Sequence, residues 1–317
     1  MDATLDILME GLIDYAGLFP PAALDMAAAV RNYAAYTRSP QATWLGRFVL
    51  PVSRLEEFSK SVASISDGDS RDPPWRLSVL IGKDLIADLK AIAAFNRGAI
   101  IDSIEMKVET AEEIRAAMAQ ISAWAATVGL GLSLGRSPGP GLGLDLVPGF
   151  TAYFEVSIQA DPAPLLAAIA AAGGRAKVRT GGVTGDLFPS PEALARFLAA
   201  CARAEVPFKA TAGLHHPVRS ARPLTYAPDS AQAKMHGFLN VFLAAAFSAN
   251  GMDPESLADL LREESPRAFA FREEEVAWQG HRLGASQLRS ARRNFALAFG
   301  SCSFEEPGED LREAGFL

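Results

Sequence analysis

Cysteine is scarce in this sequence: the 317 residues include only Cys201 and Cys302. Two isolated cysteines cannot form a disulfide framework, and they lack the paired spacing of a structural zinc site. We therefore expect two reduced thiols with no shared role.

Blocks of basic residues are also lacking. The 37 acidic residues outnumber the 30 basic ones and give a net charge of −7. A protein that tracks a phosphate backbone carries a basic stripe or patch instead. Nucleic acid is therefore not an expected partner.

No apolar stretch is long enough to cross a membrane. The longest runs, PLLAAIAAA and FLNVFLAAAF, are well short of the roughly 20 residues that a spanning helix needs. The N-terminal segment MDATLDILMEGL has no cationic run followed by an apolar one, as a secretory signal would. We expect a cytoplasmic protein without a membrane partner.

Short β-like runs alternate with longer helical runs along almost the whole chain, of which 49% is hydrophobic. The expected strands span residues 12–18, 47–52, 76–82, 103–108, 152–158, 176–181, 208–213 and 237–243. Eight strand–helix units predict an α/β fold of the (β/α)8 TIM-barrel type. An open doubly wound sheet is the alternative, but no G-x-G-x-x-G follows the first strand.

Three segments depart from the repeat. A Gly/Pro-rich loop is expected over 136–149, and a long connection over 217–235 is expected to be a lid or a binding loop. We expect residues 1–263 to form the barrel. Residues 264–317 are expected to form a small extension packed on it, with a hairpin over 268–284 and a final helix.

Polar side chains occupy one face of the later strands. They are Glu105 and Lys107 in the fourth strand, Glu155 in the fifth, Lys177 and Arg179 in the sixth, Lys209 and Thr211 in the seventh, and Asn240 in the eighth. The helix-facing side of a barrel strand must be apolar, so these groups are expected to point into the barrel. Asp14 of the first strand is expected to help balance their charge, because an unpaired buried charge is prohibitive. A purely structural ion-pair network is the alternative.

Converging cations have a chemical consequence. Each one disfavours protonation of its neighbours, and partial burial acts in the same direction. We therefore expect one lysine to be driven toward its neutral, nucleophilic form, which is the condition for forming a Schiff base.

The segments AKVRTGG and FKATAGL, with the helix-like SPEALARFLAACARA between them, resemble the paired-lysine region of deoxyribose-phosphate aldolases. These class I aldolases are TIM barrels that form a Schiff base on the sixth strand. The resemblance implies that Lys177 is the nucleophile, with Thr180 following it, and that Lys209 is the second lysine.

Two further segments extend the resemblance. LIDYAGLFPPAAL is similar to the first strand of the family, whose aspartate matches Asp14. GAIIDSIEM is similar to the fourth-strand region, where the family has a catalytic aspartate. Asp102 is the nearest match, whereas strand alternation places Glu105 on the inward face.

The sequence departs from this family at the phosphate site. The aldolases bind phosphate with Gly- and Ser/Thr-rich turns after strands seven and eight, but here HHPVRS follows strand seven. Arg179 is also foreign to the family pattern, and its planar guanidinium suits a carboxylate. We therefore expect a small, carboxylated and unphosphorylated carbonyl substrate.

His215 and His216 lie at the carboxyl end of the seventh strand. Adjacent residues of an extended chain point in opposite directions, so two such histidines seldom share a metal. Three alternatives stay open for them: structural roles, a general acid/base near the Schiff base, or a metal site built with Glu155, Glu105 or Asp14.

The leading hypothesis is a lyase of the class I aldolase type that needs no cofactor or metal. Its catalytic residues would be Lys177, Lys209, Asp14 and either Glu105 or Asp102. The expected substrate-binding residues are Arg179, Thr180, Lys107, Glu155, Thr211, His215, His216 and Asn240. A metal-dependent hydrolase or lyase and a non-catalytic barrel that binds small anions are the alternatives. A homo-oligomer is left open.

Overall fold

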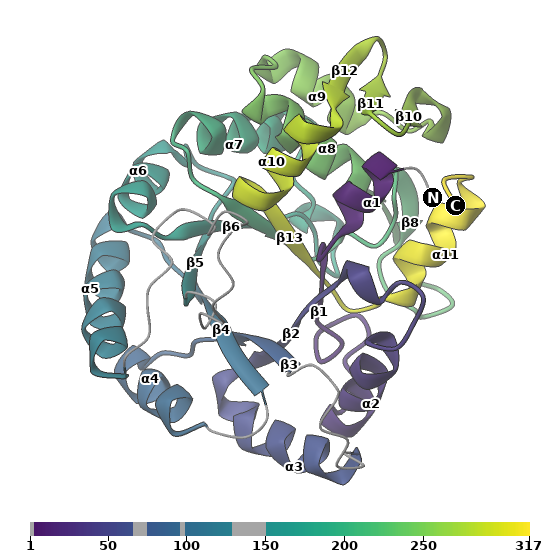
Figure 1. The fold of residues 1–317 in the computed structure, drawn as a ribbon. Coiled ribbons are helices and arrows are strands. Elements are labelled where there is room, and N and C mark those ends of the chain that lie inside the picture. Colours follow the sequence, from purple (N-terminus) through teal and green to yellow (C-terminus); the bar gives the residue numbers. More distant parts are fainter. Residues whose placement is uncertain (1–2, 66–74, 96–98, 129–149) are drawn as a thin grey trace.

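Eight parallel strands close into a barrel ringed by helices (Figure 1). The computed structural model describes residues 3–65, 75–95, 99–128 and 150–317. The barrel strands are β1 (Ile13–Tyr15), β2 (Leu45–Pro51), β3 (Trp75–Leu80), β4 (Ala99–Lys107), β5 (Thr151–Val156), β6 (Arg175–Arg179), β7 (Phe208–Thr211) and β13 (Ala296–Ser301). Their order around the barrel is β1-β13-β7-β6-β5-β4-β3-β2, so the predicted (β/α)8 barrel is confirmed.

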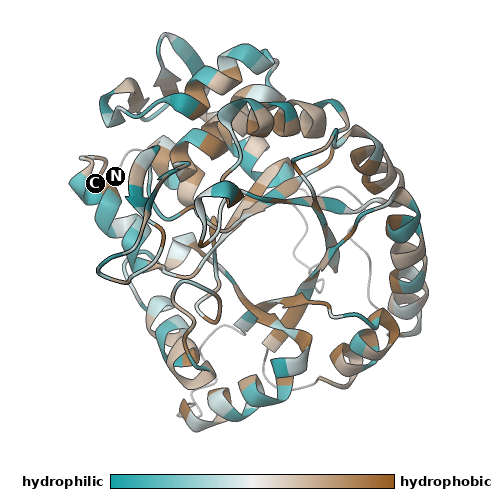
Figure 2. Cartoon of the chain, turned by 180° about the vertical axis from the view of Figure 1, so that it is seen from behind, coloured by the Kyte–Doolittle hydropathy of each residue, from teal (hydrophilic) through white to brown (hydrophobic). Residues whose placement is uncertain are grey.

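Helices follow the strands and cover the outside of the barrel. They are α1 (Ala3–Met9), α2 (Met26–Tyr36), α3 (Leu55–Ile65), α4 (Leu85–Ala94), α5 (Ala111–Val128), α6 (Ala163–Ala172), α7 (Pro191–Arg203), α8 (Phe238–Ala249), α9 (Pro254–Arg262), α10 (Ala285–Asn294) and α11 (Glu305–Glu313). Hydrophilic and hydrophobic stretches alternate along these helices in Figure 2. This pattern is typical of helices with one face on the barrel and the other in solvent.

Polar side chains cap the first turns of two helices. The Ser190 hydroxyl accepts a hydrogen bond from the backbone N–H of Ala193 at 3.2 Å and so caps α7. At the start of α5, the Thr110 hydroxyl accepts from the Glu113 N–H, and the Glu113 carboxylate accepts from the Thr110 N–H. Such reciprocal bonds satisfy N–H groups that the first turn of a helix leaves unpaired.

The eighth barrel strand is not the expected one. Residues 237–243 were predicted as a strand, but they begin helix α8, and the barrel is closed by β13. β13 pairs with β7 on one side and with β1 on the other, where Phe299 lies opposite Ile13. The barrel therefore does not end at residue 263, because the segment 264–317 supplies its last strand.

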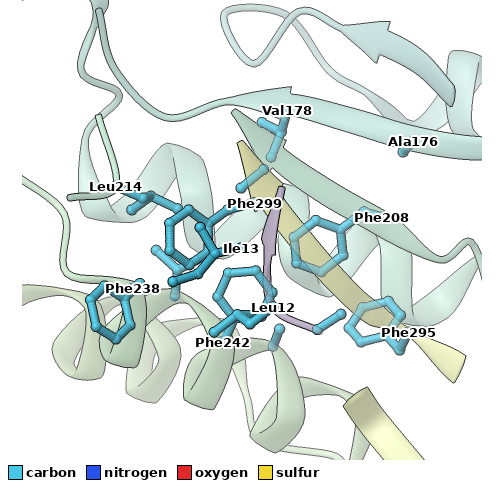
Figure 3. Packing of buried hydrophobic residues seen from close by; sticks show 14 of the residues in the cluster. Leu12, Ile13, Ala176, Val178, Phe208, Leu214, Phe238, Phe242, Phe295 and Phe299 are labelled. Carbon is cyan, nitrogen blue, oxygen red and sulfur yellow. The ribbon is translucent and has the colours of Figure 1, made fainter. Parts of the chain in front are cut away.

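The reason for this error is burial. Every side chain of α8 from Phe238 to Ser248 is buried, so the helix has no polar face and no helical periodicity in its sequence. Figure 3 shows Phe238 and Phe242 of α8 packed against the outward side chains of the strands, with Phe208 of β7 and Phe299 of β13 among them. Conversely, no glycine or proline separates α10 from β13, so the strand reads as a continuation of the helix.

Two small sheets lie outside the barrel. The segment expected as a hairpin forms a three-stranded antiparallel sheet of β10 (Phe269–Phe271), β11 (Glu275–Trp278) and β12 (His281–Gly284). The long connection after β7 folds as an antiparallel pair, β8 (Ser220–Pro223) and β9 (Gln232–Met235), which we call the β8–β9 hairpin. The loop expected over 136–149 lies outside the described residues.

None of the helices among the described residues is both long enough and apolar enough to cross a bilayer.

Candidate functional site

Two buried lysines form the centre of the barrel interior. Lys177 of β6 and Lys209 of β7 lie opposite each other in the sheet register. The Lys177 Nζ is 2.9 Å from a carboxylate oxygen of Glu105 and 2.9 Å from one of Glu155. The Lys209 Nζ is 2.5 Å from Asp14 and 2.7 Å from the other carboxylate oxygen of Glu105. The structure thus brings together five of the residues expected at the site.

The strand pleat explains this placement. The neighbours of Lys177 along β6, Ala176 and Val178, point outward into the core between strands and helices, as Figure 3 shows. Since successive strand residues alternate between the two faces, Lys177 must point into the barrel. The same alternation places Lys209 inside, because Phe208 and Ala210 belong to the outer core.

Glu105 is held by groups that the sequence analysis missed. The Ser78 hydroxyl of β3 donates to a Glu105 oxygen at 2.6 Å, and the Ser103 hydroxyl donates to Ser78 at 2.9 Å. The ring of Tyr153 lies beneath, with its centroid 5.3 Å from the Lys209 Nζ. The sequence does indicate Ser78. It is a polar residue between apolar Leu77 and Val79, and the same alternation places the polar residues of the later strands inside the barrel.

The carboxylates decide the protonation state of the lysines. Burial alone would lower the pKa of Lys177, but Glu105 and Glu155 outweigh burial and raise this pKa above its ordinary value. Burial would also lower the pKa of Lys209, but Asp14 and Glu105 outweigh burial and raise this pKa above its ordinary value. Burial would raise the pKa of Glu105, but the two lysines hold it well below its usual range. The expected lowering of a lysine pKa is therefore not found in this site, because the carboxylates favour the ammonium form of both lysines.

A cavity of about 260 Å³ opens above the lysines, and we call it the barrel pocket. Its charged floor consists of Glu105, Lys177 and Lys209. Its walls are mainly apolar, formed by Ala16, Phe19, Pro20, Val49, Leu80, Val183, Leu187 and Ala212, and Arg179, Thr211, Gly182, Gly300, His215 and Cys302 complete the lining. A mainly apolar cleft with a few convergent charged groups has the usual make-up of a small-molecule site.

Arg179 lies at the mouth of the barrel pocket. Its side chain is 46% exposed, and its Nε is 3.4 Å from Glu155. This long contact leaves most of the guanidinium donors available to a ligand. Arg179 thus lines the same cavity as the two lysines, and its expected contact with a substrate carboxylate stays a prediction.

Asp102 belongs to a different cluster. The pairing of β3 with β4 shifts between Leu77 and Ser78, so that Asp102 is an extra residue without an opposite partner. Its carboxylate binds the Arg47 side chain and accepts from the Arg76 Nε at 2.8 Å. These arginines hold the pKa of Asp102 below its ordinary value against the effect of burial. Glu105, rather than Asp102, is therefore the fourth-strand carboxylate that contacts the lysines.

Three expected binding residues lie away from the lysines. The side chain of Lys107 is 75% exposed, with its Nζ 3.7 Å from Glu109. The buried Thr180 hydroxyl donates to the backbone oxygen of Ala212 at 2.7 Å and so joins the two turns that follow β6 and β7. Asn240 lies on α8, where its amide donates to the backbone oxygen of Leu260 at 2.8 Å and of Glu263 at 2.9 Å, and its oxygen accepts from the Arg219 N–H. Asn240 was misplaced because its segment is a helix rather than a strand.

A second cavity of about 380 Å³ adjoins the first, and we call it the hairpin pocket. The β8–β9 hairpin supplies much of its lining, including Arg222, Leu224, Tyr226 and Met235. Four residues line both cavities, and His215 is the only one with an ionisable side chain; the others are Pro20, Gly182 and Ala212. The long connection expected to be a binding loop thus helps to form a cavity beside the lysines.

The two histidines bind different carboxylates of α11. The His215 Nδ1 is 3.2 Å from Glu306, and the His216 Nδ1 is 2.5 Å from Asp310. The centroids of the two rings are 6.3 Å apart. Among the described residues, no group of three or more His, Cys, Asp or Glu side chains is arranged to hold a metal ion.

The two cysteines lie apart. Cys201 is buried in α7, and burial raises the pKa of its thiol well above the ordinary value. Cys302 follows β13 and lines the barrel pocket, with its sulfur 3.8 Å from the Tyr226 hydroxyl. The expectation of two free thiols agrees with this placement, although Cys302 faces the cavity.

No protein-family model and no curated protein matched this sequence.

Proposed function

We propose that this protein is a Schiff-base-forming lyase of the class I aldolase type, acting on a small carbonyl substrate that carries a carboxylate and no phosphate. One observation carries the proposal: the Lys177 Nζ lies at the floor of the barrel pocket, held between Glu105 and Glu155 at 2.9 Å each. A barrel interior is normally filled with branched apolar side chains. Charged groups at this place, open to a cavity, are those expected of a reactive site.

The first requirement is a neutral amine. Lys177 rests as an ammonium ion between two carboxylates, and Glu155, which contacts one of the two lysines whereas Glu105 contacts both, accepts its proton when a substrate enters. A substrate that fills the cavity displaces water, and the loss of solvation favours neutral groups over ion pairs. Lys209 keeps its proton, and its charge stabilises Glu105 as a carboxylate.

The chemistry then follows from the amine. The Lys177 nitrogen attacks the substrate carbonyl carbon, the carbonyl oxygen leaves as water after taking up two protons, and an iminium ion forms. The bond between the α and β carbons breaks, and its electrons form an enamine. The β-hydroxyl loses its proton to a base and becomes an aldehyde. Protonation of the enamine carbon and hydrolysis of the iminium ion release the second product and restore Lys177.

Arg179 explains the preference for a carboxylate. Its guanidinium lies at the mouth above Lys177, on the same strand and the same face. An arginine binds a carboxylate through two parallel hydrogen bonds, which also orient the ligand. A 2-oxo acid bound in this way would present its ketone to the amine below.

The test is reductive trapping. The protein is incubated with pyruvate, acetone or acetaldehyde in the presence of sodium borohydride and analysed by peptide mass spectrometry. We expect an adduct on Lys177 and none in Lys177→Met. Lys107→Met is the matched control, because the Lys107 side chain is 75% exposed and its Nζ lies 3.7 Å from Glu109. It should be labelled like the wild type.

Two results would reject the proposal. Labelling at a lysine other than Lys177 would show that the Schiff base forms on a different residue. Turnover of a substrate without any trapped adduct would favour the metal-dependent alternative, which elemental analysis of protein purified without chelator then checks. If Lys177→Met changed neither ligand affinity nor any activity, the non-catalytic anion-binding barrel would be preferred.

A further inference from the structure

The wall between the two cavities holds a histidine with one occupied nitrogen. The His215 Nδ1 is 3.2 Å from Glu306 and 3.4 Å from the Ser301 hydroxyl. Within the part of the chain that the structure describes, no residue hydrogen-bonds the other ring nitrogen, Nε2. A carboxylate on Nδ1 fixes the tautomer that leaves Nε2 to exchange protons with a ligand.

Glu306 is itself held in place. Its carboxylate accepts from the Tyr226 hydroxyl at 3.4 Å. Burial would raise the pKa of Glu306, but His215 is the main group that outweighs burial and lowers this pKa. Glu306 therefore stays ionised beside the ring and can stabilise an imidazolium. It acts through His215 and is a positioning residue.

The charges of the hairpin pocket disfavour an anionic ligand. Arg222 is 3.4 Å from Asp310, which also binds His216. Burial lowers the pKa of His216, so that this ring is neutral near pH 7. The carboxylates of Asp310 and Glu306 thus offset the cations of this cavity. The hairpin pocket therefore offers a second carboxylate in the ligand no excess of positive charge.

The remaining surface of this cavity is mainly apolar. Pro20 and Pro21 contribute from the turn after β1, and Leu224, Pro228 and Met235 contribute from the β8–β9 hairpin. At about 380 Å³ the hairpin pocket is the larger of the two cavities. It has room for a compact, uncharged organic group beside the one held over Lys177.

We propose that the hairpin pocket binds the second reactant, an uncharged aldehyde with an apolar body, and that His215 exchanges a proton with the aldehyde oxygen. This inference rests on the proposed function. The cavity over Lys177 and Arg179 holds the carboxylated donor, and the adjoining cavity holds the acceptor, with His215 at their common wall.

The aldol step forms one carbon–carbon bond and transfers one proton. The enamine carbon attached to Lys177 attacks the aldehyde carbon and forms the new carbon–carbon bond. The π electrons of the aldehyde move to its oxygen, which takes the proton from the Nε2 of protonated His215. The enamine becomes an iminium ion that water hydrolyses, and His215 regains a proton from solvent. Cleavage follows the same path in reverse, with His215 as the base.

The experiment separates the donor half from the acceptor half of the reaction. Pyruvate is the donor probe, isobutyraldehyde the uncharged acceptor and glyoxylate the anionic acceptor. Three readouts are followed: borohydride trapping on Lys177, solvent deuterium exchange into the pyruvate methyl group, and formation of the aldol product. In the wild type we expect kcat/KM for isobutyraldehyde to exceed that for glyoxylate at least tenfold.

In His215→Gln, trapping on Lys177 and deuterium exchange should be unchanged. The rate of aldol formation should fall about 100-fold or more, as expected when a general acid is removed. Glu306→Gln should lower aldol formation about tenfold and leave trapping unchanged. His281→Gln is the control, because His281 lies on the exposed strand β12, which does not line either pocket. Its readouts should match those of the wild type.

Three outcomes overturn the inference. They are unchanged aldol formation in His215→Gln, an equal loss of trapping and aldol formation in that variant, and a preference for glyoxylate. If the wild type forms no adduct on Lys177, the proposed function fails, and the acceptor site fails with it. Thermal unfolding of each variant checks that a loss of product is not a loss of folded protein.

Discussion

Glu105 binds Lys177 across an intervening strand. The carboxylate of Glu105 on β4 lies 2.9 Å from the Lys177 Nζ on β6, although β5 separates these strands in the sheet. The pair therefore spans the interior of the barrel rather than running along its wall. Because the other oxygen of Glu105 binds Lys209, one carboxylate ties three strands together at the level of the proposed reaction.

The first prediction concerns the stability that Glu105 provides. Glu105→Gln removes a buried charge between two buried ammonium groups, and we expect the free energy of unfolding to fall by about 3–5 kcal/mol. Urea titration followed by circular dichroism measures this change. Glu57→Gln is the matched control, since Glu57 forms an exposed pair with Arg54. That variant should lose less than about 1 kcal/mol; equal losses would contradict the buried pairing.

The second prediction concerns acid. The lysines hold the pKa of Glu105 below its ordinary value, and Lys177 does the same for Glu155 against the effect of burial. A carboxylate with a lowered pKa in the folded protein stabilises it above the unfolded value, about 4.3, and this contribution is lost as the pH falls below that value.

Burial lowers the pKa of His216 and lowers that of His236 to about 4, so the free energy of unfolding should begin to fall below about pH 6.5. We expect the carboxylates to add a further fall below about pH 4.3. Urea titrations at a series of pH values measure the slope. The slope should be shallower in Glu105→Gln, which has lost one of the responsible groups. An unchanged slope in that variant would mean that Glu105 is not ionised in the folded protein.

The third prediction tests the carboxylate anchor. Arg179→Met should raise the KM for pyruvate about 10- to 100-fold, because a charge-assisted hydrogen bond contributes about 1.5–3 kcal/mol. Acetone, which has a ketone and no carboxylate, is the matched substrate. Its trapping rate on Lys177 should be the same in the variant and the wild type. If Arg179→Met weakened the reaction of pyruvate and of acetone equally, Arg179 would support the structure of the pocket mouth rather than bind the carboxylate.

The fourth prediction concerns the turn after β7. Gly213 has a φ of +75°, and a Cβ on it would lie 2.9 Å from the Cα of Gly181 in the turn after β6. Gly213→Ala should therefore combine backbone strain with a clash between the two turns. Gly11→Ala is the control: Gly11 has a φ of +57°, and a Cβ there would meet nothing within 4 Å.

We expect Gly11→Ala to lose about 1–2 kcal/mol, the cost of the left-handed conformation, and Gly213→Ala to lose clearly more. The free energy of unfolding measures both. Trapping on Lys177 should fall only in Gly213→Ala, because only this turn borders the barrel pocket. Equal losses would mean that the two turns separate freely.

The barrel and its charged interior could be predicted from the sequence because both depend on local patterns. Strand alternation is visible within five or six residues, and it placed Lys177, Lys209 and Glu155 on the inward face. Seven of the eight strands followed from the same signal. Arg179 was found in this way too, because it shares its face with Lys177.

What could not be predicted depends on long-range packing. The burial of α8 on all sides removed the helical period from its sequence, and this moved Asn240 onto a strand that does not exist. The shift between β3 and β4 turned Asp102 inward against simple alternation. Glu306 contacts His215 from α11, far along the chain, and no local pattern indicates that contact.

The pairing of β1 with β13 has a consequence for biosynthesis. β1, which carries Asp14, leaves the ribosome first among the barrel strands, and its partner β13 leaves last. The barrel therefore cannot close before β13 has been synthesised, and Asp14 lies at an open sheet edge until residue 301 has emerged. Such a high contact order predicts slow final closure and a partly folded nascent chain. Lys209 of β7 acquires its full set of counter-charges only at that last step, because Asp14 is one of them.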